Sequence, residues 1–132
     1  MLRRISLIVV SLLILSTAAM AEGIVFFEGS WSEALATARS QRKLIFVDAY
    51  TEWCGPCKMM NRNTFPSDQV GELFNSSFVN VKLDMEKGEG LTFASRYQVN
   101  AYPTLLFLNH KGEIVHKALG YLSPRALMSE AQ

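Results

Sequence analysis

The chain is poor in cysteine and in net charge, and both shortages exclude whole classes of protein. Among 132 residues there are only two cysteines, too few for a scaffold held by several disulfides. The 13 basic and 12 acidic residues nearly cancel, whereas a nucleic-acid-binding protein usually carries a basic excess. A hydrophobic content of 49% also excludes a disordered chain, which needs low hydrophobicity and high net charge. We therefore expect one folded domain with no nucleic-acid partner.

The first 21 residues lack acidic side chains and have the composition of a secretory signal. Two arginines precede an uncharged run from residue 5 to 21, and residues 19–21, Ala-Met-Ala, provide the small residues of a signal-peptidase site. We predict cleavage after Ala21, which leaves residues 22–132 as an exported domain, periplasmic in a bacterium. The alternative is an uncleaved membrane anchor, because the uncharged run lies at the lower edge of a spanning length. Export would place both cysteines where disulfides form and persist.

Segments typical of strands and helices alternate along the rest of the chain. Apolar runs predict strands at residues 24–27, 43–50, 78–84, 104–108 and 113–119. Capping residues and apolar spacing predict helices at residues 31–40, 57–63, 68–75 and 91–97, and a last one after Ser123-Pro124. This order indicates an α/β domain with a mixed central sheet flanked by helices, ending in a β-hairpin and a helix.

The two cysteines lie at the start of a predicted helix, directly after a buried strand. Cys54 and Cys57 are three residues apart, so they share one face of the first helical turn and can form a disulfide. Free N–H groups and the helix dipole favour a thiolate at a helix N-terminus, which makes Cys54 the predicted nucleophile. Cys57, one turn into the helix and expected to be more buried, is the predicted resolving thiol. Pro56 stiffens the turn at a position where it removes no helix hydrogen bond.

Two other interpretations of this pair remain open. The pair is formally half of a zinc site with His110 and His116, although the gap of 52 residues between the halves far exceeds that of a small zinc finger, about 12–15 residues. A purely structural disulfide would close almost no loop and would stabilise the fold little. We expect no metal and no cofactor other than the redox-active Cys54–Cys57 disulfide.

Residues 53–58, Trp-Cys-Gly-Pro-Cys-Lys, resemble the thioredoxin active-site motif residue for residue. The resemblance extends over roughly residues 43–125 and implies the thioredoxin fold. Residues 46–48, Phe-Val-Asp, place an aspartate six residues before the first cysteine, as thioredoxins do, and residues 81–84, Val-Lys-Leu-Asp, resemble the next central strand. Residues 102–104, Tyr-Pro-Thr, resemble the loop that faces the active site with a cis-proline. The flanking regions resemble exported thioredoxin-like proteins related to the C-terminal domain of the periplasmic disulfide reductase DsbD.

The resemblance implies roles for further residues. Asp48 would accept the proton of Cys57 through water, because burial of a carboxylate raises its pKa. The resemblance also places Lys82 near Asp48 and among the catalytic residues. The alternative for Asp48 is a structural charge paired with Lys82. A cis peptide bond before Pro103 would let the backbone at residue 102 pair with an extended substrate. The residues implied to contact substrate are Trp53, Gly55, Pro56, Tyr102 and Pro103.

The implied activity is exported thiol–disulfide exchange, most simply the reduction of disulfides in protein substrates by a monomer. Gly-Pro between the cysteines resembles the reducing members of the family, and a reductase in an oxidising compartment needs a supply of electrons. We therefore expect a membrane electron donor as a partner. Tyr102 departs from the isoleucine usual in thioredoxins and resembles protein disulfide isomerase domains, which keeps an oxidase or isomerase open. A peptide- or metal-binding module without turnover is the alternative from another class.

Overall fold

The computed structural model describes residues 22–132. The predicted signal segment, its cleavage site and the alternative anchor lie outside the described residues. The elements in chain order are α1 (Trp31–Gln41), β1 (Leu44–Tyr50), α2 (Gly55–Asn63), α3 (Asp68–Ser77), β2 (Phe78–Asp84), α4 (Glu89–Tyr97), β3 (Thr104–Leu108), β4 (Ile114–Leu119) and α5 (Pro124–Glu130). None of the helices in this part of the chain is long and apolar enough to cross a membrane.

The sheet has four strands in the order β2-β1-β3-β4. β1 pairs in parallel with β2 and antiparallel with β3, and β4 pairs antiparallel with β3 as the predicted hairpin. Residues 45–49 of β1 are all buried, as expected for an apolar run in a central strand covered on both faces. The mixed sheet and the terminal hairpin confirm the predicted α/β fold.

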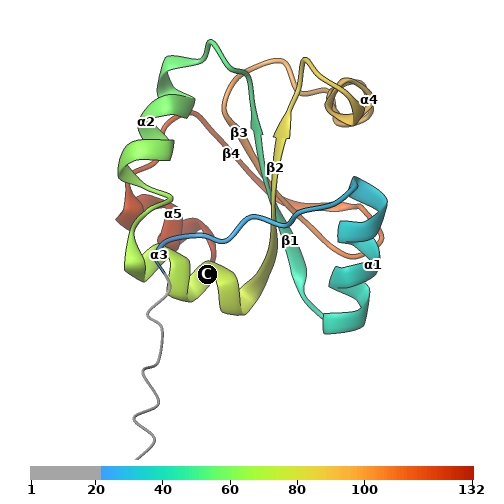
Figure 1. Ribbon diagram of the computed structural model, residues 1–132, viewed down its shortest axis with the longest axis horizontal. Helices are drawn as coiled ribbons and strands as arrows, with labels where there is room; N and C mark the ends of the chain where they lie inside the picture. Colours follow the sequence, from blue (N-terminus) through green and yellow to red (C-terminus); the bar gives the residue numbers. More distant parts are fainter. Residues whose placement is uncertain (1–21) are drawn as a thin grey trace, which may run out of the picture.

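Helices cover both faces of the sheet and create two hydrophobic cores. On one face α1 and α4 pack against the sheet, and on the other face α2, α3 and α5 do so (Figure 1). Phe46 and Val47, adjacent in β1, point to different cores because successive strand residues face opposite sides. The second core is rich in phenylalanine, with Phe46, Phe74 and Phe107 in mutual ring contact.

Serine side chains begin three of the helices, as the sequence predicts. The Ser30 hydroxyl accepts the Glu33 N–H and the Glu33 carboxylate accepts the Ser30 N–H, which together form the predicted capping box of α1. Ser67 and Ser123 cap α3 and α5 in the same way through their hydroxyls. These caps satisfy backbone N–H groups that have no partner inside the helix.

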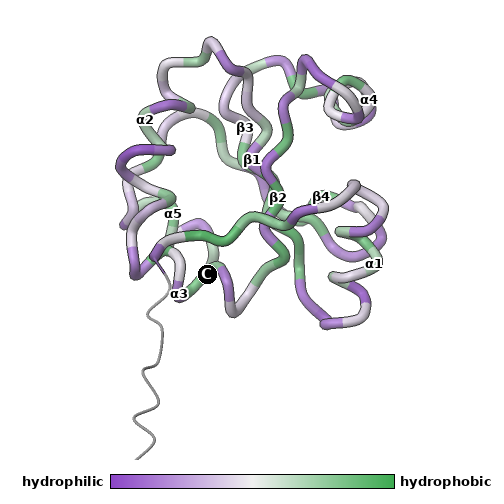
Figure 2. The backbone as a smooth tube through the Cα atoms, in the orientation of Figure 1, coloured by the Kyte–Doolittle hydropathy of each residue, from purple (hydrophilic) through white to green (hydrophobic). Residues whose placement is uncertain are grey.

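The predicted strand at residues 24–27 is wrong. The segment is extended and apolar, and it crosses in front of β2 from the α3 side of the sheet to α1 (Figure 1 and Figure 2). Its N–H groups bind three separate parts of the chain: Ile24 donates to Phe65 O in the turn after α2, Val25 to the Asn75 side chain of α3 and Phe27 to Asn80 O of β2. A strand needs one continuous neighbour, and an apolar run alone cannot reveal that the partners are scattered. We call residues 22–29 the N-terminal strap.

Candidate active site

The cysteine pair lies at the N-terminus of α2, which follows β1 in the chain after a short loop. Cys54 and Cys57 form a disulfide, with their Cα atoms 5.3 Å apart. α2 begins at Gly55, two residues earlier than predicted, because Cys54 itself is the N-cap. The Cys57 N–H donates to Cys54 Sγ over 3.2 Å. In the reduced protein a hydrogen bond to a sulfur favours its thiolate form. In this pair the sulfur that accepts the bond is that of Cys54.

Burial does not rank the two cysteines. Cys54 is 3% exposed and Cys57 is 2% exposed, so the predicted greater burial of Cys57 is present but too small to distinguish the two. What distinguishes the two is position: only Cys54 stands at the cap, where a backbone N–H points at its sulfur. Gly55 and Pro56, which connect the two buried cysteines, are themselves exposed.

Asp48 lies in the middle of β1 and is 1% exposed. In the sheet it is opposite Lys82 of β2, and Lys82 Nζ lies 2.8 Å from Asp48 Oδ2. The other carboxylate oxygen, Oδ1, is buried without a hydrogen-bond partner in the described part of the chain. Burial raises the pKa of Asp48, and the Lys82 ammonium offsets only part of that rise. The ion pair expected of a structural charge is therefore present, together with the raised pKa expected of a proton acceptor.

Trp53 and the loop before β3 form the exposed rim of the site. The Tyr102–Pro103 peptide bond is cis, as the resemblance implied. The rings of Trp53 and Tyr102 meet edge to face with their centroids 5.7 Å apart, which joins this loop to the cysteine loop. Trp53 is 65% exposed, unusually high for so large an apolar side chain. The five residues predicted to contact substrate thus lie just before α2, in its first turn, or in the loop before β3 that packs against it.

The loop after β2 contributes contacts that sequence reasoning missed. Trp53 Nε1–H donates to the Glu86 carboxylate over 2.6 Å, and Lys87 pairs with Glu52 over 2.6 Å. Residues 86–89 resemble an ordinary solvated loop in the sequence. No spacing signal marks Glu86, because its partner lies 33 residues away and the contact exists only in the folded domain.

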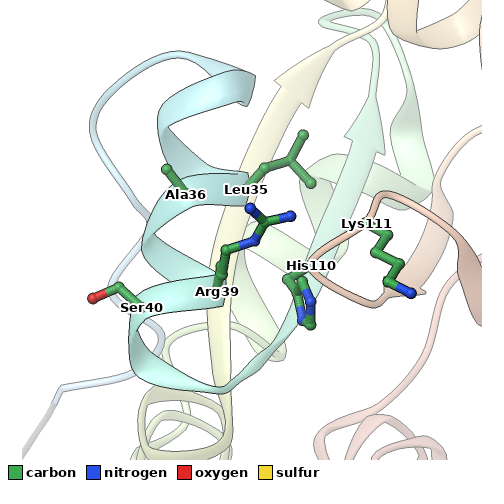
Figure 3. Close-up of a pocket in the computed structure, with 6 residues that line it drawn as sticks. All are labelled: Leu35, Ala36, Arg39, Ser40, His110 and Lys111. Atoms are coloured by element: carbon green, nitrogen blue, oxygen red, sulfur yellow. The ribbon is translucent and has the colours of Figure 1, made fainter.

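The two histidines lie on other parts of the domain and do not complete a zinc site with the cysteines. His116 contacts Glu130 of α5 and the ring of Phe107. His110 follows β3, at the opposite end of that strand from Pro103, and borders a cavity of about 550 Å³ between α1 and the β3–β4 turn (Figure 3). Within residues 22–132 no group of three or more His, Cys, Asp or Glu side chains is arranged to hold a metal ion.

Comparison with known proteins agrees with this geometry. A family model described as thioredoxin-like matches residues 27–110. The chain belongs to the thioredoxin-like family. Thioredoxin H1 of Arabidopsis thaliana is 34% identical over 91 residues, which cover 69% of this chain and 74% of that protein. The thiol:disulfide interchange protein DsbD of Pseudoalteromonas atlantica is 28% identical over 105 residues, or 77% of this chain but only 18% of that protein.

Solved structures show the same relationship. A putative disulphide-isomerase from Bacteroides thetaiotaomicron is 48% identical with a TM-score of 0.72, covering 84% of this chain and 93% of that one. A thioredoxin from Thermus thermophilus is 26% identical with a TM-score of 0.72, covering 82% and 84%. Together with the Cys54–Cys57 disulfide, these similarities identify this thioredoxin-like protein as a thiol–disulfide oxidoreductase.

Proposed function

We propose that the protein is exported and reduces disulfides in other proteins. The observation that carries this proposal is the position of Cys54, which caps α2 and accepts a backbone N–H at its sulfur. A backbone N–H at the sulfur and the helix N-terminus favour the thiolate form of a reduced Cys54, which makes it the nucleophile. The exposed Trp53 and the loop at Pro103 provide an open face for an extended segment of a substrate protein.

The reaction proceeds through two exchanges of sulfur partners. The Cys54 thiolate attacks a substrate disulfide, forms a mixed disulfide and releases the first substrate sulfur as a thiolate. Cys57 then attacks Cys54 Sγ, re-forms the Cys54–Cys57 disulfide and releases the second substrate thiol. The proton that Cys57 must lose passes to Asp48, through water, at Oδ1, which accepts no hydrogen bond from residues 22–132. Each cycle leaves the enzyme oxidised by two electrons.

An electron donor must therefore reduce the Cys54–Cys57 disulfide after each cycle. The chain has no third cysteine for an internal relay, so these electrons come from another molecule. We propose a membrane protein as the donor, and the similarity to part of DsbD together with the predicted signal segment supports this proposal. N-terminal sequencing of the exported protein should begin at Glu22, and a retained Met1 in the membrane fraction would favour the anchored form.

The reduction potential and the two cysteine variants test this proposal. We expect a potential on the order of −270 mV against glutathione, and a value near −120 mV would contradict a reductase. Cys54→Ser should abolish the reduction of insulin disulfides. Cys57→Ser should accumulate a mixed disulfide, which non-reducing electrophoresis detects. Insulin reduction that survives Cys54→Ser would refute the assigned nucleophile.

A second candidate function is disulfide isomerisation. Tyr102 before the cis-proline and the similarity to a putative disulphide-isomerase favour it. Isomerisation needs only one thiolate, because the same sulfur that enters the mixed disulfide also leaves it. Recovery of activity from scrambled ribonuclease by Cys57→Ser, with little insulin reduction by the wild type, would favour this alternative.

A further inference from the structure

The Lys82 ammonium is enclosed by aromatic rings as well as by oxygen atoms. Besides Asp48, it donates to Asn61 Oδ1 over 2.5 Å. Three ring centroids lie within 5.2 Å of Lys82 Nζ: Tyr50 at 4.8 Å, Phe65 at 4.9 Å and Phe26 at 5.2 Å. Ring faces attract cations at this separation, and the attraction grows when water is excluded. Tyr50 comes from β1, Phe65 from the segment after α2, and Phe26 from the N-terminal strap.

The Lys82 ammonium has a possible second position, away from Asp48. The Lys82 side chain is 25% exposed, and it borders a cavity of about 280 Å³ that Glu22, Phe26 and Asn61 also line. Its flexible four-carbon stem could carry the ammonium into this space, toward water and the carboxylate of Glu22. Phe26 contacts the ammonium in its present position and also lines the cavity, so its ring borders both positions. The ring thus favours the position beside Asp48.

We propose that Phe26 is a positioning residue of the active site, which holds the Lys82 ammonium against Asp48. The strap fixes the ring from both sides: Val25 N–H binds the Asn75 side chain and Phe27 N–H binds Asn80 O. Phe26 also packs edge to face on Phe65, with centroids 5.4 Å apart. The strap therefore acts on the active site, although it lies outside the sheet and carries no group that takes part in the reaction.

The position of Lys82 controls how readily Asp48 takes up a proton. Burial raises the pKa of Asp48, and among residues 22–132 Lys82 is the charged group that opposes the rise. Tyr50 lies two residues along β1, Asn61 of α2 is neutral, and the Cys54–Cys57 disulfide does not titrate in the oxidised protein. A less closely held ammonium offsets less of the burial effect, so the pKa of Asp48 should rise further.

The test is a pH titration of the Asp48 carboxyl carbon by NMR in the oxidised protein. Phe26→Leu keeps an apolar side chain over the pair but removes the ring face, and should raise the midpoint by up to about half a pH unit. Lys82→Gln should raise it by more. In the Lys82→Gln background Phe26→Leu should have no further effect, because the residue acts through Lys82. Phe26→Tyr, which keeps a ring, should retain the wild-type midpoint.

The neighbouring variant Phe27→Leu is the matched control. Phe27 is an aromatic residue of the same strap, but it packs on the other core and does not contact Lys82, so the midpoint should not move. The proposal is overturned if Phe26→Leu leaves the midpoint unchanged or lowers it, or if it raises the midpoint equally when Lys82 is replaced. Phe26→Met provides a second ringless side chain if Phe26→Leu does not fold.

This inference rests on the proposed function only for the catalytic use of Asp48. The titration needs no substrate and no reduced cysteine, so its outcome is independent of insulin reduction. Failure of the insulin assay with a normal titration would refute the proposed reaction and leave the positioning role intact. The reverse result would refute the role of Phe26 alone.

Discussion

Asp48 should make the stability of the oxidised protein depend on pH, and Asp48→Asn should remove that dependence. In the unfolded chain the carboxyl loses its proton at about pH 4. In the folded protein burial raises its pKa, so the carboxyl keeps its proton to higher pH. Between these two pKa values the folded state binds a proton that the unfolded state has lost. The wild type therefore loses stability as the pH rises through this window.

The size of the effect follows from the number of protons involved. One proton that is bound only in the folded state makes the free energy of unfolding change by about 1.4 kcal/mol per pH unit. Asparagine has nearly the same shape but does not titrate. The free energy of unfolding of Asp48→Asn minus that of the wild type should therefore increase with this slope above pH 4. It should level off once the pH exceeds the folded pKa of Asp48. The lost contact with Lys82 adds an offset.

Urea unfolding of both oxidised proteins, followed by circular dichroism between pH 4 and pH 9, measures this difference. Glu72→Gln is the matched control, because it removes one carboxylate from the exposed surface of α3. A difference between Asp48→Asn and the wild type that stays flat from pH 4 to pH 8 would refute the reasoning. Asp48 would then ionise in the folded protein as it does in the unfolded chain.

Three further predictions concern stability and are checked by urea unfolding at pH 7. Phe74→Ala should lower the free energy of unfolding by about 3–5 kcal/mol, because Phe74 is fully buried among the rings of the second core, and a loss under 1 kcal/mol would contradict this packing. Ser30→Ala should lower the free energy of unfolding by about 1 kcal/mol, because it removes the α1 cap. Ser32→Ala, two residues further on, should lower it by less. Tyr97→Phe should cost roughly 1 kcal/mol, because the hydroxyl donates to Gly112 O over 2.7 Å, and an unchanged midpoint would mean that the bond adds nothing.

Local sequence signals were sufficient for most of the fold and for the reaction centre. The strands at residues 78–84 and 104–108 have the bounds that the sequence pattern predicts, from alternating apolar residues in the first and an apolar run in the second. The N-caps at Ser30, Ser67 and Ser123 mark helix starts by short-range hydrogen bonds that the chain encodes within a few residues. The cysteine spacing is equally local, since a helical turn brings residues three apart together.

Contacts between distant residues were less accessible from the sequence. The run at residues 24–27 has the composition of a strand, yet its N–H groups bind a turn, a helix and a strand that are far apart in the sequence, and only the folded domain decides that. The contact of Trp53 with Glu86 likewise joins two loops that no periodicity relates.

The sequence by itself determined the chemistry of this protein: a cysteine pair at the start of a helix, a carboxylate in a buried strand and a proline loop to face them. The tertiary structure decided how that chemistry is tuned. Parallel pairing of β1 with β2 places Lys82 opposite Asp48, and the strap brings Phe26 to the same ammonium. The physical reason is that pKa values depend on burial and on charges within a few ångströms, and these follow from packing between segments far apart in the chain.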